Sequence, residues 1–260
     1  MCLIFIALDN HPQYQLILAA NRDEFYARRT APAGFWADHP DLVGGRDLEA
    51  MGTWMAMTKS GRIAMVTNFR DPKNINPKAP SRGKLVSDYL IHPISPKDYL
   101  EELEPRGKEF NGFNLVTGNP DELYYYSNYG PGVAKIEKGF HALSNHLLDT
   151  PWPKVVRVKE KLESLLSGSR LQPDILLDAL YDETRAPLQQ LPDTGVGTEL
   201  EQALSSMFIK TPQYGTRCST VVLVDRKNEV TYSERVYDVT DFSSRTRSFQ
   251  FRIQPNNNLK

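Results

Sequence analysis

The chain has 260 residues, and its 31 Lys and Arg residues nearly balance its 32 Asp and Glu residues, which gives a formal net charge of −1. This balance argues against a dedicated nucleic-acid binder, which needs a net basic face to displace phosphate counterions. Apolar residues make up 40% of the chain and charged residues 24%, a composition typical of a globular protein and unlike a disordered one. We expect one domain over residues 1–254 and a polar tail over residues 255–260.

The first part of the chain has the patterns of β-strands joined by short turns. Four segments are apolar and rich in β-formers, and we expect strands there: 2–8, 15–21, 53–58 and 62–68. Residues 71–80 hold three prolines and two asparagines, which predicts a loop. Short helices are expected at residues 81–90 and 96–103.

The rest of the chain places helices between two groups of strands. Further strands are expected at residues 111–117, 123–126, 133–137, 139–144, 217–224, 230–237 and 246–253. Helices are expected at residues 153–166, 173–181 and 198–207; the first has an apolar stripe and is followed by Gly168, a typical helix stop. This order indicates an α+β protein with helices packed on largely antiparallel sheets.

The two cysteines, Cys2 and Cys218, are too few for a disulfide framework or a four-cysteine zinc site. Free thiols without an export signal indicate a reducing compartment, so we expect a cytoplasmic protein. No apolar run approaches the roughly 20 residues that span a bilayer, and we expect no transmembrane segment. The sequence leaves the oligomeric state open.

Cys2 is the most informative residue because it follows the initiator methionine. A side chain as small as cysteine allows that methionine to be removed, which leaves Cys2 with a free α-amine. The pKa of an α-amino group is about 7.7–8.0 and that of a thiol about 8.5, so one residue then supplies a nucleophile and a base. Cys2 is either such an N-terminal nucleophile or a small buried residue that opens an edge strand.

The polar segment 21–25, Asn-Arg-Asp-Glu-Phe, follows the second expected strand, and a hairpin brings it near Cys2. Arg22 can lower the pKa of the thiol or hold a substrate carboxylate. Asp23 can orient the amine or balance the charge of Arg22. The alternative is a solvated turn with a structural ion pair.

Three later polar residues lie at the ends of expected strands. Asn68 and Asn145 each follow a strand, and Arg217 begins one. Amides and an arginine can stabilise a developing oxyanion, although asparagine at a strand end is also common in turns.

Met1-Cys2 and the segment 20–25 resemble the NRDE-motif family, the homologues of transport and Golgi organisation protein two. The resemblance covers nearly the whole chain. Its other motifs are Thr67-Asn68, Arg82-Gly83, Asn111-Gly112-Phe113-Asn114-Leu115, Leu143-Ser144-Asn145, Thr150-Pro151-Trp152 and Tyr214-Gly215-Thr216-Arg217. This family in turn is similar to the cysteine N-terminal-nucleophile hydrolases that include penicillin V acylase and bile-salt hydrolase. That similarity implies a four-layer αββα sandwich.

The hydrolase resemblance also implies catalytic roles. Cys2 would be nucleophile and base, Arg22 would position the thiol, and Arg217 would support the site. Asn68 and Asn145 would bind the oxyanion or the substrate. One departure is that the hydrolases space their early Arg and Asp three apart, whereas Arg22 and Asp23 are adjacent, so Asp23 or Glu24 would have to contact the amine.

The NRDE-family resemblance implies the binding and intracellular trafficking of haem, or the handling of an acyl-CoA or lipid. Haem would be cargo; no cofactor is required and no metal site is expected. The ligand-binding residues would be Asn21, Arg22, Asp23, Glu24 and His146, the last being the best axial candidate because it follows Asn145 at the expected pocket rim. For CoA, phosphates could meet Arg22, Arg28, Arg29 and Arg70, whose alternative is a solvated basic face.

A rival function is an enzyme in which the Cys2 thiol attacks a linear or cyclic amide and water releases the acyl group. The residues themselves support this hydrolase better than they support haem. A third reading is a scaffold with an inactive pocket. The sequence leaves all three open.

Overall fold

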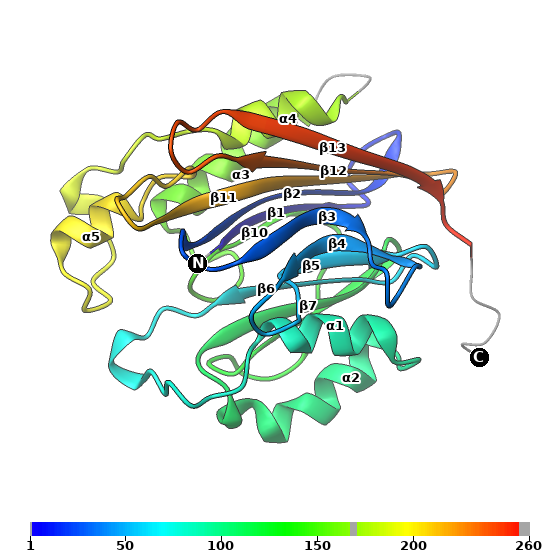
Figure 1. Cartoon of the computed structure of the whole chain (residues 1–260), viewed down its shortest axis with the longest axis horizontal. Coiled ribbons are helices and arrows are strands. Elements are labelled where there is room, and N and C mark those ends of the chain that lie inside the picture. The colour runs from blue at the N-terminus through cyan, green and yellow to red at the C-terminus, as the bar shows by residue number, and fades with distance from the viewer. Residues whose placement is uncertain (1, 167–170, 255–260) are drawn as a thin grey trace.

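The computed structural model describes residues 2–166 and 171–254 (Figure 1). Gly168, which is expected to end a helix, and the tail over residues 255–260 lie outside the described residues. Within the described part of the chain, no helix is long and apolar enough to cross a membrane.

Two antiparallel β-sheets form the middle of the molecule. Among the described residues, the first sheet has six strands in the order β10-β1-β2-β11-β12-β13, and the second has seven in the order β3 to β9. The first sheet consists of β1 (Cys2–Leu8), β2 (Tyr14–Phe25), β10 (Gly139–Leu143), β11 (Tyr214–Asp225), β12 (Glu229–Tyr237) and β13 (Ser244–Arg252). The second consists of β3 (Thr30–Phe35), β4 (Leu42–Asp47), β5 (Met55–Thr58), β6 (Ile63–Asn68), β7 (Phe113–Asn119), β8 (Glu122–Ser127) and β9 (Ala134–Lys135).

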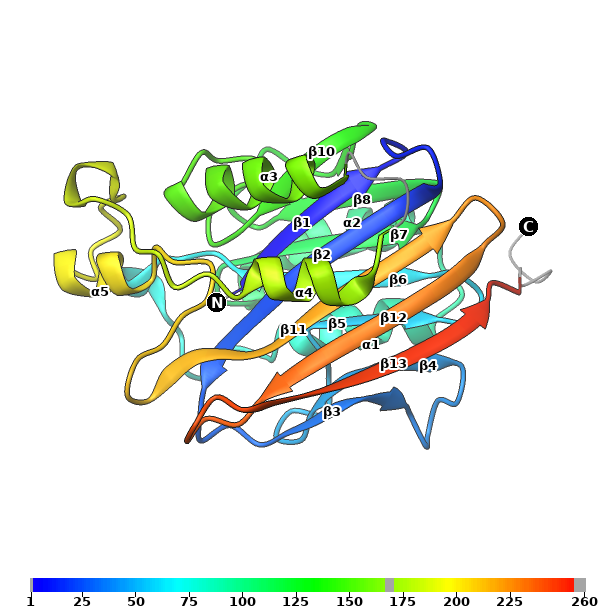
Figure 2. The same ribbon diagram turned by 90° about the horizontal axis from the view of Figure 1, so that it is seen from above.

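Helices cover the outer face of each sheet (Figures 1 and 2). The helices on the first sheet are α3 (Pro153–Leu166) and α4 (Pro173–Leu180), and those on the second are α1 (Gly83–Ile91) and α2 (Pro96–Leu103). The short helix α5 (Thr198–Ala203) and the 3-10 helices η1 (Pro72–Asn74), η2 (Glu104–Glu109) and η3 (Leu188–Gln190) lie in connections. The four-layer αββα sandwich expected from the resemblance is confirmed.

Alternation along β1 divides its side chains between two cores. Ile4 and Ile6 point into the core between the sheets. Leu3 and Phe5 point to the opposite face, where they pack with Leu162 and other residues of α3. Because successive side chains of a strand point to opposite faces, a continuous apolar run lets one strand bury both faces.

Strands β3 and β4 are the main elements that the sequence did not predict. β3 contains Pro32 and Gly34, a composition typical of a turn. Pro32 is tolerated because β3 is an edge strand whose register with β4 shifts between Ala31 and Gly34. In β4, a Cβ atom on Gly44 would lie 2.5 Å from the Cβ of Ala56, so close packing with β5 favours glycine there.

The polar segment 21–25 lies inside β2, not after it as the sequence analysis expected. Arg22 pairs directly with Cys2 across the two strands, so both side chains point between the sheets. Asn21 and Asp23 therefore point to the helix-covered face. The motif is divided between two faces of the first sheet.

Asn21 connects the first sheet to the layer that covers it. Its Nδ2 donates to the carbonyls of Leu180 at 3.0 Å and Met207 at 2.8 Å, and its Oδ1 accepts from Ser219 Oγ at 2.6 Å. The side chain is buried, and these three bonds fix the end of α4 and the segment after α5 against β2 and β11. The sequence predicted that Asn21 binds ligand, but its side-chain contacts here are with the protein itself and stabilise the fold.

We expect Asn21→Ala to lower the free energy of unfolding by about 2–4 kcal/mol, because it removes three buried hydrogen bonds, to the Leu180 and Met207 carbonyls and from Ser219. Urea unfolding, followed by circular dichroism, measures this loss. Asn74→Ala is the control: its amide donates to Asp71 in an exposed turn, and we expect a change within about 0.5 kcal/mol. Equal losses in the two variants would contradict the anchoring role.

Candidate functional site

Cys2 lines a cavity of about 270 Å³ at one end of the sandwich, which we call the Cys2 cavity. Its walls include the starts of β1 and α1, the ends of β2, β4 and β6, and residues of the connections between strands and helices. Among the lining residues are Cys2, Arg22, Glu24, Arg28, Asp47, Trp54, Asn68, Arg82 and Gly83. The fold therefore places Cys2, Arg22, Glu24 and Asn68 around one cavity, and Asp23 borders it although its side chain points to the helix-covered face.

Arg22 lies beside Cys2 with only 5% of its side chain exposed. Its guanidinium carbon is 4.1 Å from the centroid of the Trp54 ring, and its Nη2 is 3.6 Å from the Glu24 carboxylate. Its Nη1 is buried and has no hydrogen-bond partner among the described residues. A buried guanidinium with an unused donor is suited to hold an anionic group of a ligand.

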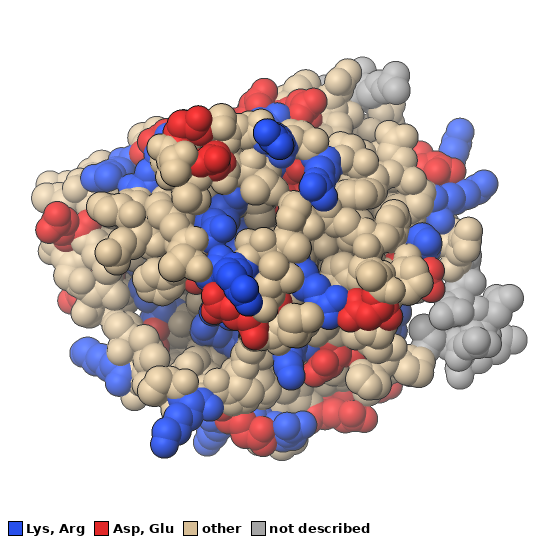
Figure 3. All heavy atoms as spheres, viewed as in Figure 1, with Lys and Arg blue, Asp and Glu red and all other residues tan. Residues whose placement is uncertain are grey.

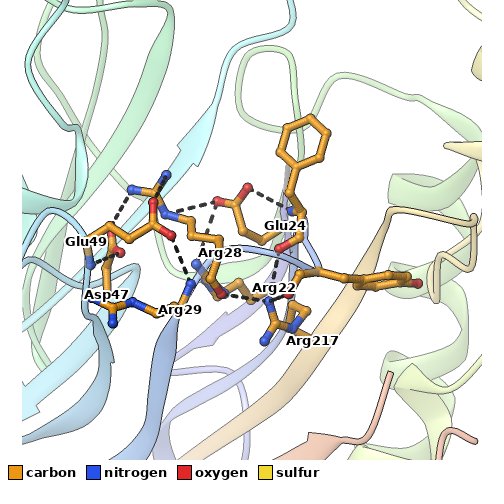
Figure 4. A network of polar contacts seen from close by, with 9 residues as sticks. Arg22, Glu24, Arg28, Arg29, Asp47, Glu49 and Arg217 are labelled. Carbon is orange, nitrogen blue, oxygen red and sulfur yellow. Dashed lines mark hydrogen bonds and ion pairs between the residues drawn. The ribbon is translucent and has the colours of Figure 1, made fainter. Parts of the chain in front are cut away.

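Further charged residues form a network of polar contacts next to this cavity (Figure 4). Arg28 donates from Nη2 to Asp47 at 2.6 Å and lies 3.9 Å from Glu24 and 3.8 Å from Glu49. These acids balance Arg28. On the molecular face in Figure 3, basic and acidic side chains are interspersed in the same way.

Arg217 lies next to this network but lines neither this cavity nor the larger one described below. Its Nη1 donates to the carbonyls of Phe25, Tyr26 and Arg28 at 3.0, 3.2 and 3.0 Å. It sits where the register of β11 with β2 shifts, between Thr216 and Cys218. Arg217 thus holds the turn after β2, and through it the position of Arg28.

Burial dominates the electrostatics of Cys2 and Asp23. Burial raises the pKa of the Cys2 thiol, while the charge of Arg22 and a hydrogen bond from the Asp23 backbone act in the opposite direction. Burial also raises the pKa of the Asp23 carboxyl, and the ammonium of Lys154 counteracts this. Asp23 Oδ1 accepts a hydrogen bond from Thr216 at 2.7 Å. A thiol with a raised pKa needs a base before it can attack a carbonyl.

The two asparagines expected at the site occupy different places. Asn68 ends β6 and lines the Cys2 cavity. Asn145 is fully buried behind it, and its Nδ2 donates to the Asn68 carbonyl at 2.9 Å. Its Oδ1 accepts from Lys154 Nζ at 3.1 Å. Asn145 therefore braces Asn68, and Asn68 is the amide that faces the cavity.

A second, larger cavity of about 530 Å³ adjoins the first, and we call it the apolar trough. Its apolar walls are Phe25, Phe69, Pro72, Ile75, Val196, Leu200, Leu204 and Tyr214. Both cavities are lined by Glu24, Arg28, Asn68, Arg82 and Asn111, so they meet along these residues. At the rim of the trough, Phe25 is 59% and Ile75 65% exposed.

His146, the expected axial candidate for haem, lines neither cavity. Its Nδ1 is 2.9 Å from Thr150 Oγ1, and its ring packs between Phe69 and Trp152. Burial lowers its pKa, so the imidazole is neutral at pH 7. Within the ranges that the structure describes, no group of three or more His, Cys, Asp or Glu side chains is placed to hold a metal ion.

The buried ammonium behind the site was not predicted from the sequence. Lys154, in the first turn of α3, is only 1% exposed. Arg70, for which the sequence predicted a CoA phosphate contact or a solvated basic face, forms a buried ion pair with Glu201 of α5, so it does not lie on a solvated face. One signal was present: Lys154 lies four residues before Val158 and eight before Leu162, on the apolar stripe of its helix.

Comparisons with known proteins agree with this architecture. The solved structure of a mutant conjugated bile acid hydrolase from Clostridium perfringens superposes with a TM-score of 0.50 at 8% identity, covering 97% of this chain and 98% of that one. At this identity the likeness concerns the fold alone. The fold is therefore similar to that of the N-terminal-nucleophile hydrolases, as the sequence resemblance implied.

Sequence comparison gives the family. The sequence model described as "Transport and Golgi organisation 2" matches residues 1–239. The human Transport and Golgi organization protein 2 homolog is 36% identical over 276 residues, covering 98% of this chain and all of that protein. The Drosophila melanogaster Transport and Golgi organization protein 2 is 31% identical over 264 residues, covering 90% of this chain and 91% of that protein. The chain belongs to the Transport and Golgi organisation 2 family.

Proposed function

We propose that this protein binds and transfers an amphipathic molecule with an anionic head. The head would lie in the Cys2 cavity and the apolar part in the apolar trough. The observation that carries this proposal is that an arginine-lined cavity and an apolar one share five lining residues, Glu24, Arg28, Asn68, Arg82 and Asn111. One ligand can occupy both.

Two arginines are suited to hold the head. Arg22 has a buried, unused donor in Nη1. Arg82 lines both cavities and is held by a 2.9 Å bond from Nη1 to the Gly112 carbonyl. Arg82 also directly precedes α1, whose first residue, Gly83, lines the Cys2 cavity. The amides at a helix N-terminus favour an anion, which adds to the charge of the two arginines.

The trough is suited to the apolar part of such a ligand. Its volume of about 530 Å³ lies within the usual range of small-molecule sites, about 300–1,000 Å³. Ile75 and Leu200 line the trough while 65% and 43% exposed, so a bound chain would remove apolar surface from water. This gain supplies the affinity that the polar head alone would lack.

Haem and an acyl-CoA both have this chemistry, since each joins anionic groups to an apolar body. His146 lies outside both cavities, which favours a cargo held by its anionic and apolar parts over one held through an iron bond to His146. We therefore rank an acyl-CoA or similar lipid above haem, the cargo first expected from the sequence. Both cysteines are unbonded, which suits the cytoplasmic location we propose.

We expect Ile75→Glu to weaken the binding of palmitoyl-CoA at least about tenfold, because a carboxylate replaces apolar surface at the trough. Isothermal titration calorimetry measures the Kd, and CoA without an acyl chain should bind both proteins equally. Ile175→Glu is the matched control, since Ile175 is 46% exposed on α4 and lines neither cavity. Equal affinities of the two variants would remove the trough from the site.

The head is tested by Arg22→Gln, which keeps a hydrogen-bond donor and removes the charge. We expect about tenfold weaker binding of both palmitoyl-CoA and CoA, since a charge-assisted bond is lost. Arg157→Gln is the control: Arg157 belongs to α3 and lines neither cavity, so this variant should bind as the unaltered protein does. Haemin is titrated in parallel: a saturable Soret shift near one equivalent, weakened by Arg22→Gln, would make haem the cargo. If Arg22→Gln binds every ligand with unchanged affinity, Arg22 does not hold the anionic head.

A second function, amide hydrolysis, is favoured by Cys2 itself. Its half-buried thiol lines the cavity beside Arg22 and Asn68. If Met1 is removed, the α-amine can take the thiol proton, the thiolate attacks an amide carbonyl, and the amine product leaves with that proton. Water then releases the acyl group from sulfur. The similar solved structure is named for hydrolysis of conjugated bile acids, which supports testing amphipathic amides.

For the hydrolase, we expect the intact mass of the purified protein to lack one methionine. Incubation with an amphipathic amide library should then give turnover and a mass increase from the acyl-enzyme. Cys2→Ala should abolish both, while Cys218→Ala should abolish neither. A mass that retains Met1, or turnover that survives in Cys2→Ala, would exclude this mechanism and leave the carrier role.

A further inference from the structure

Lys154 is a buried charge that neither proposed function uses. Its side chain is only 1% exposed, although a lysine on a surface helix would normally place its ammonium in water. Burying an ammonium is costly unless opposite charge and hydrogen bonds compensate it. The groups around Lys154 therefore show what its charge does.

Four charged or titratable groups surround the ammonium, from four parts of the chain. Asp23 of β2 faces it from the helix-covered side of the first sheet, and Cys2 of β1 lies in the same sheet with its side chain on the other face. Arg70 belongs to the segment after β6, and Glu201 to α5. Arg70 and Glu201 are paired with each other in a buried ion pair. At Lys154 the repulsion from Arg70 exceeds the attraction to Glu201, so Asp23, whose interaction with the ammonium is the strongest, is the main group that compensates its charge.

We propose that Lys154 is a positioning residue of the Cys2 site, whose ammonium fixes the orientation of the Asn145 amide and balances the buried charge of Asp23 next to Cys2. This inference concerns one end of the ligand site proposed above, and its functional meaning rests on that proposal.

The hydrogen bonds show how Lys154 reaches the cavity wall. An ammonium can only donate, so its partner on Asn145 is the oxygen Oδ1, 3.1 Å away. The amide nitrogen of Asn145 then points to the Asn68 carbonyl, to which it donates at 2.9 Å. The backbone carbonyl of Asn145 also accepts from the Arg70 backbone N–H at 2.8 Å. Lys154, together with Ser144 Oγ, which donates to Oδ1 at 3.2 Å, thus holds the Asn145 side chain against the segment that lines both cavities.

The charge of Lys154 acts on the first sheet from the helix side. Asp23 is 1% exposed, and the ammonium opposes the rise in its pKa that burial causes. The interaction with Cys2 favours the ammonium when the thiol is ionised, and by reciprocity it favours the thiolate. Burial lowers the pKa of Lys154 to about 8, so its charge is present at pH 7 and is lost as the pH rises through about 8.

The test measures the reactivity of Cys2 without any ligand. Full-length protein is alkylated with iodoacetamide between pH 6 and 10, and peptide mapping gives the rate at Cys2. Lys154→Met removes charge and donor, whereas Lys154→Gln keeps a donor. We expect both to slow alkylation at pH 7 by about threefold to tenfold, because the thiolate loses a favourable charge, and we expect the difference to shrink above about pH 8, where Lys154 itself loses its charge.

Lys161→Met is the matched control, since Lys161 lies two turns along α3 and pairs with Asp182 at the surface. Its Cys2 profile should equal that of the unaltered protein. Lys154 profiles that also equal it would overturn the proposal. Because no ligand is used, this failure is distinct from a failure of the binding proposal.

A second measurement applies if the single variants are too unstable to study. The double variant Asp23→Asn, Lys154→Met removes both buried charges, so neither charge is left unpaired. We expect the double variant to have a higher Tm than Lys154→Met alone, because the mutual compensation is removed from both sides. A double variant no more stable than the single one would show that Lys154 does not balance Asp23, and would overturn the proposal.

Discussion

The antiparallel pairing of β1 with β2 is the constraint on which the site depends. Its register runs without interruption from Cys2 opposite Arg22 to Leu8 opposite Leu16. Because side chains alternate between faces, a shift of one residue would turn Arg22 into the helix layer and Asn21 into the cavity. The apolar residues of both strands prevent that shift by filling two different cores, one on each face. The cores that stabilise the fold therefore also place the thiol beside the guanidinium.

Local sequence patterns predicted the strands and helices whose burial follows directly from their apolar residues. The strand over residues 2–8 and the helix over residues 153–166 agree with β1 and α3, since their apolar periodicity reports burial directly. β4 was missed because Gly44 and Gly45 suggest a turn. Their small size is explained only by contacts from elsewhere: a Cβ atom on Gly45 would lie 2.2 Å from the Trp54 ring. Such close approaches have no local signal.

In the candidate site, too, local patterns predicted some residues, whereas contacts between distant residues could not be predicted. The hairpin pattern and the family resemblance predicted that Cys2, Arg22 and Asn68 lie in one site. The contacts of Asn145 and Arg217 could not be predicted, because both residues bind backbone atoms far away in the sequence. Residue type alone does not distinguish an amide that faces a cavity from one that braces its wall. Long-range contacts decide this.

The distribution of charge along the first sheet separates the needs of stability from those of function. At one end, the row of residues that faces the second sheet is Leu8, Leu16 and Val224, all buried and apolar. At the other end, the corresponding row is Cys2, Arg22 and Cys218, and Asp23 and Lys154 lie buried behind it. Apolar residues would fill this end at a lower desolvation cost, as they do at the first. Stability alone does not explain why one end of the sheet is charged, whereas a site that holds an anionic group and tunes a thiol requires such charges.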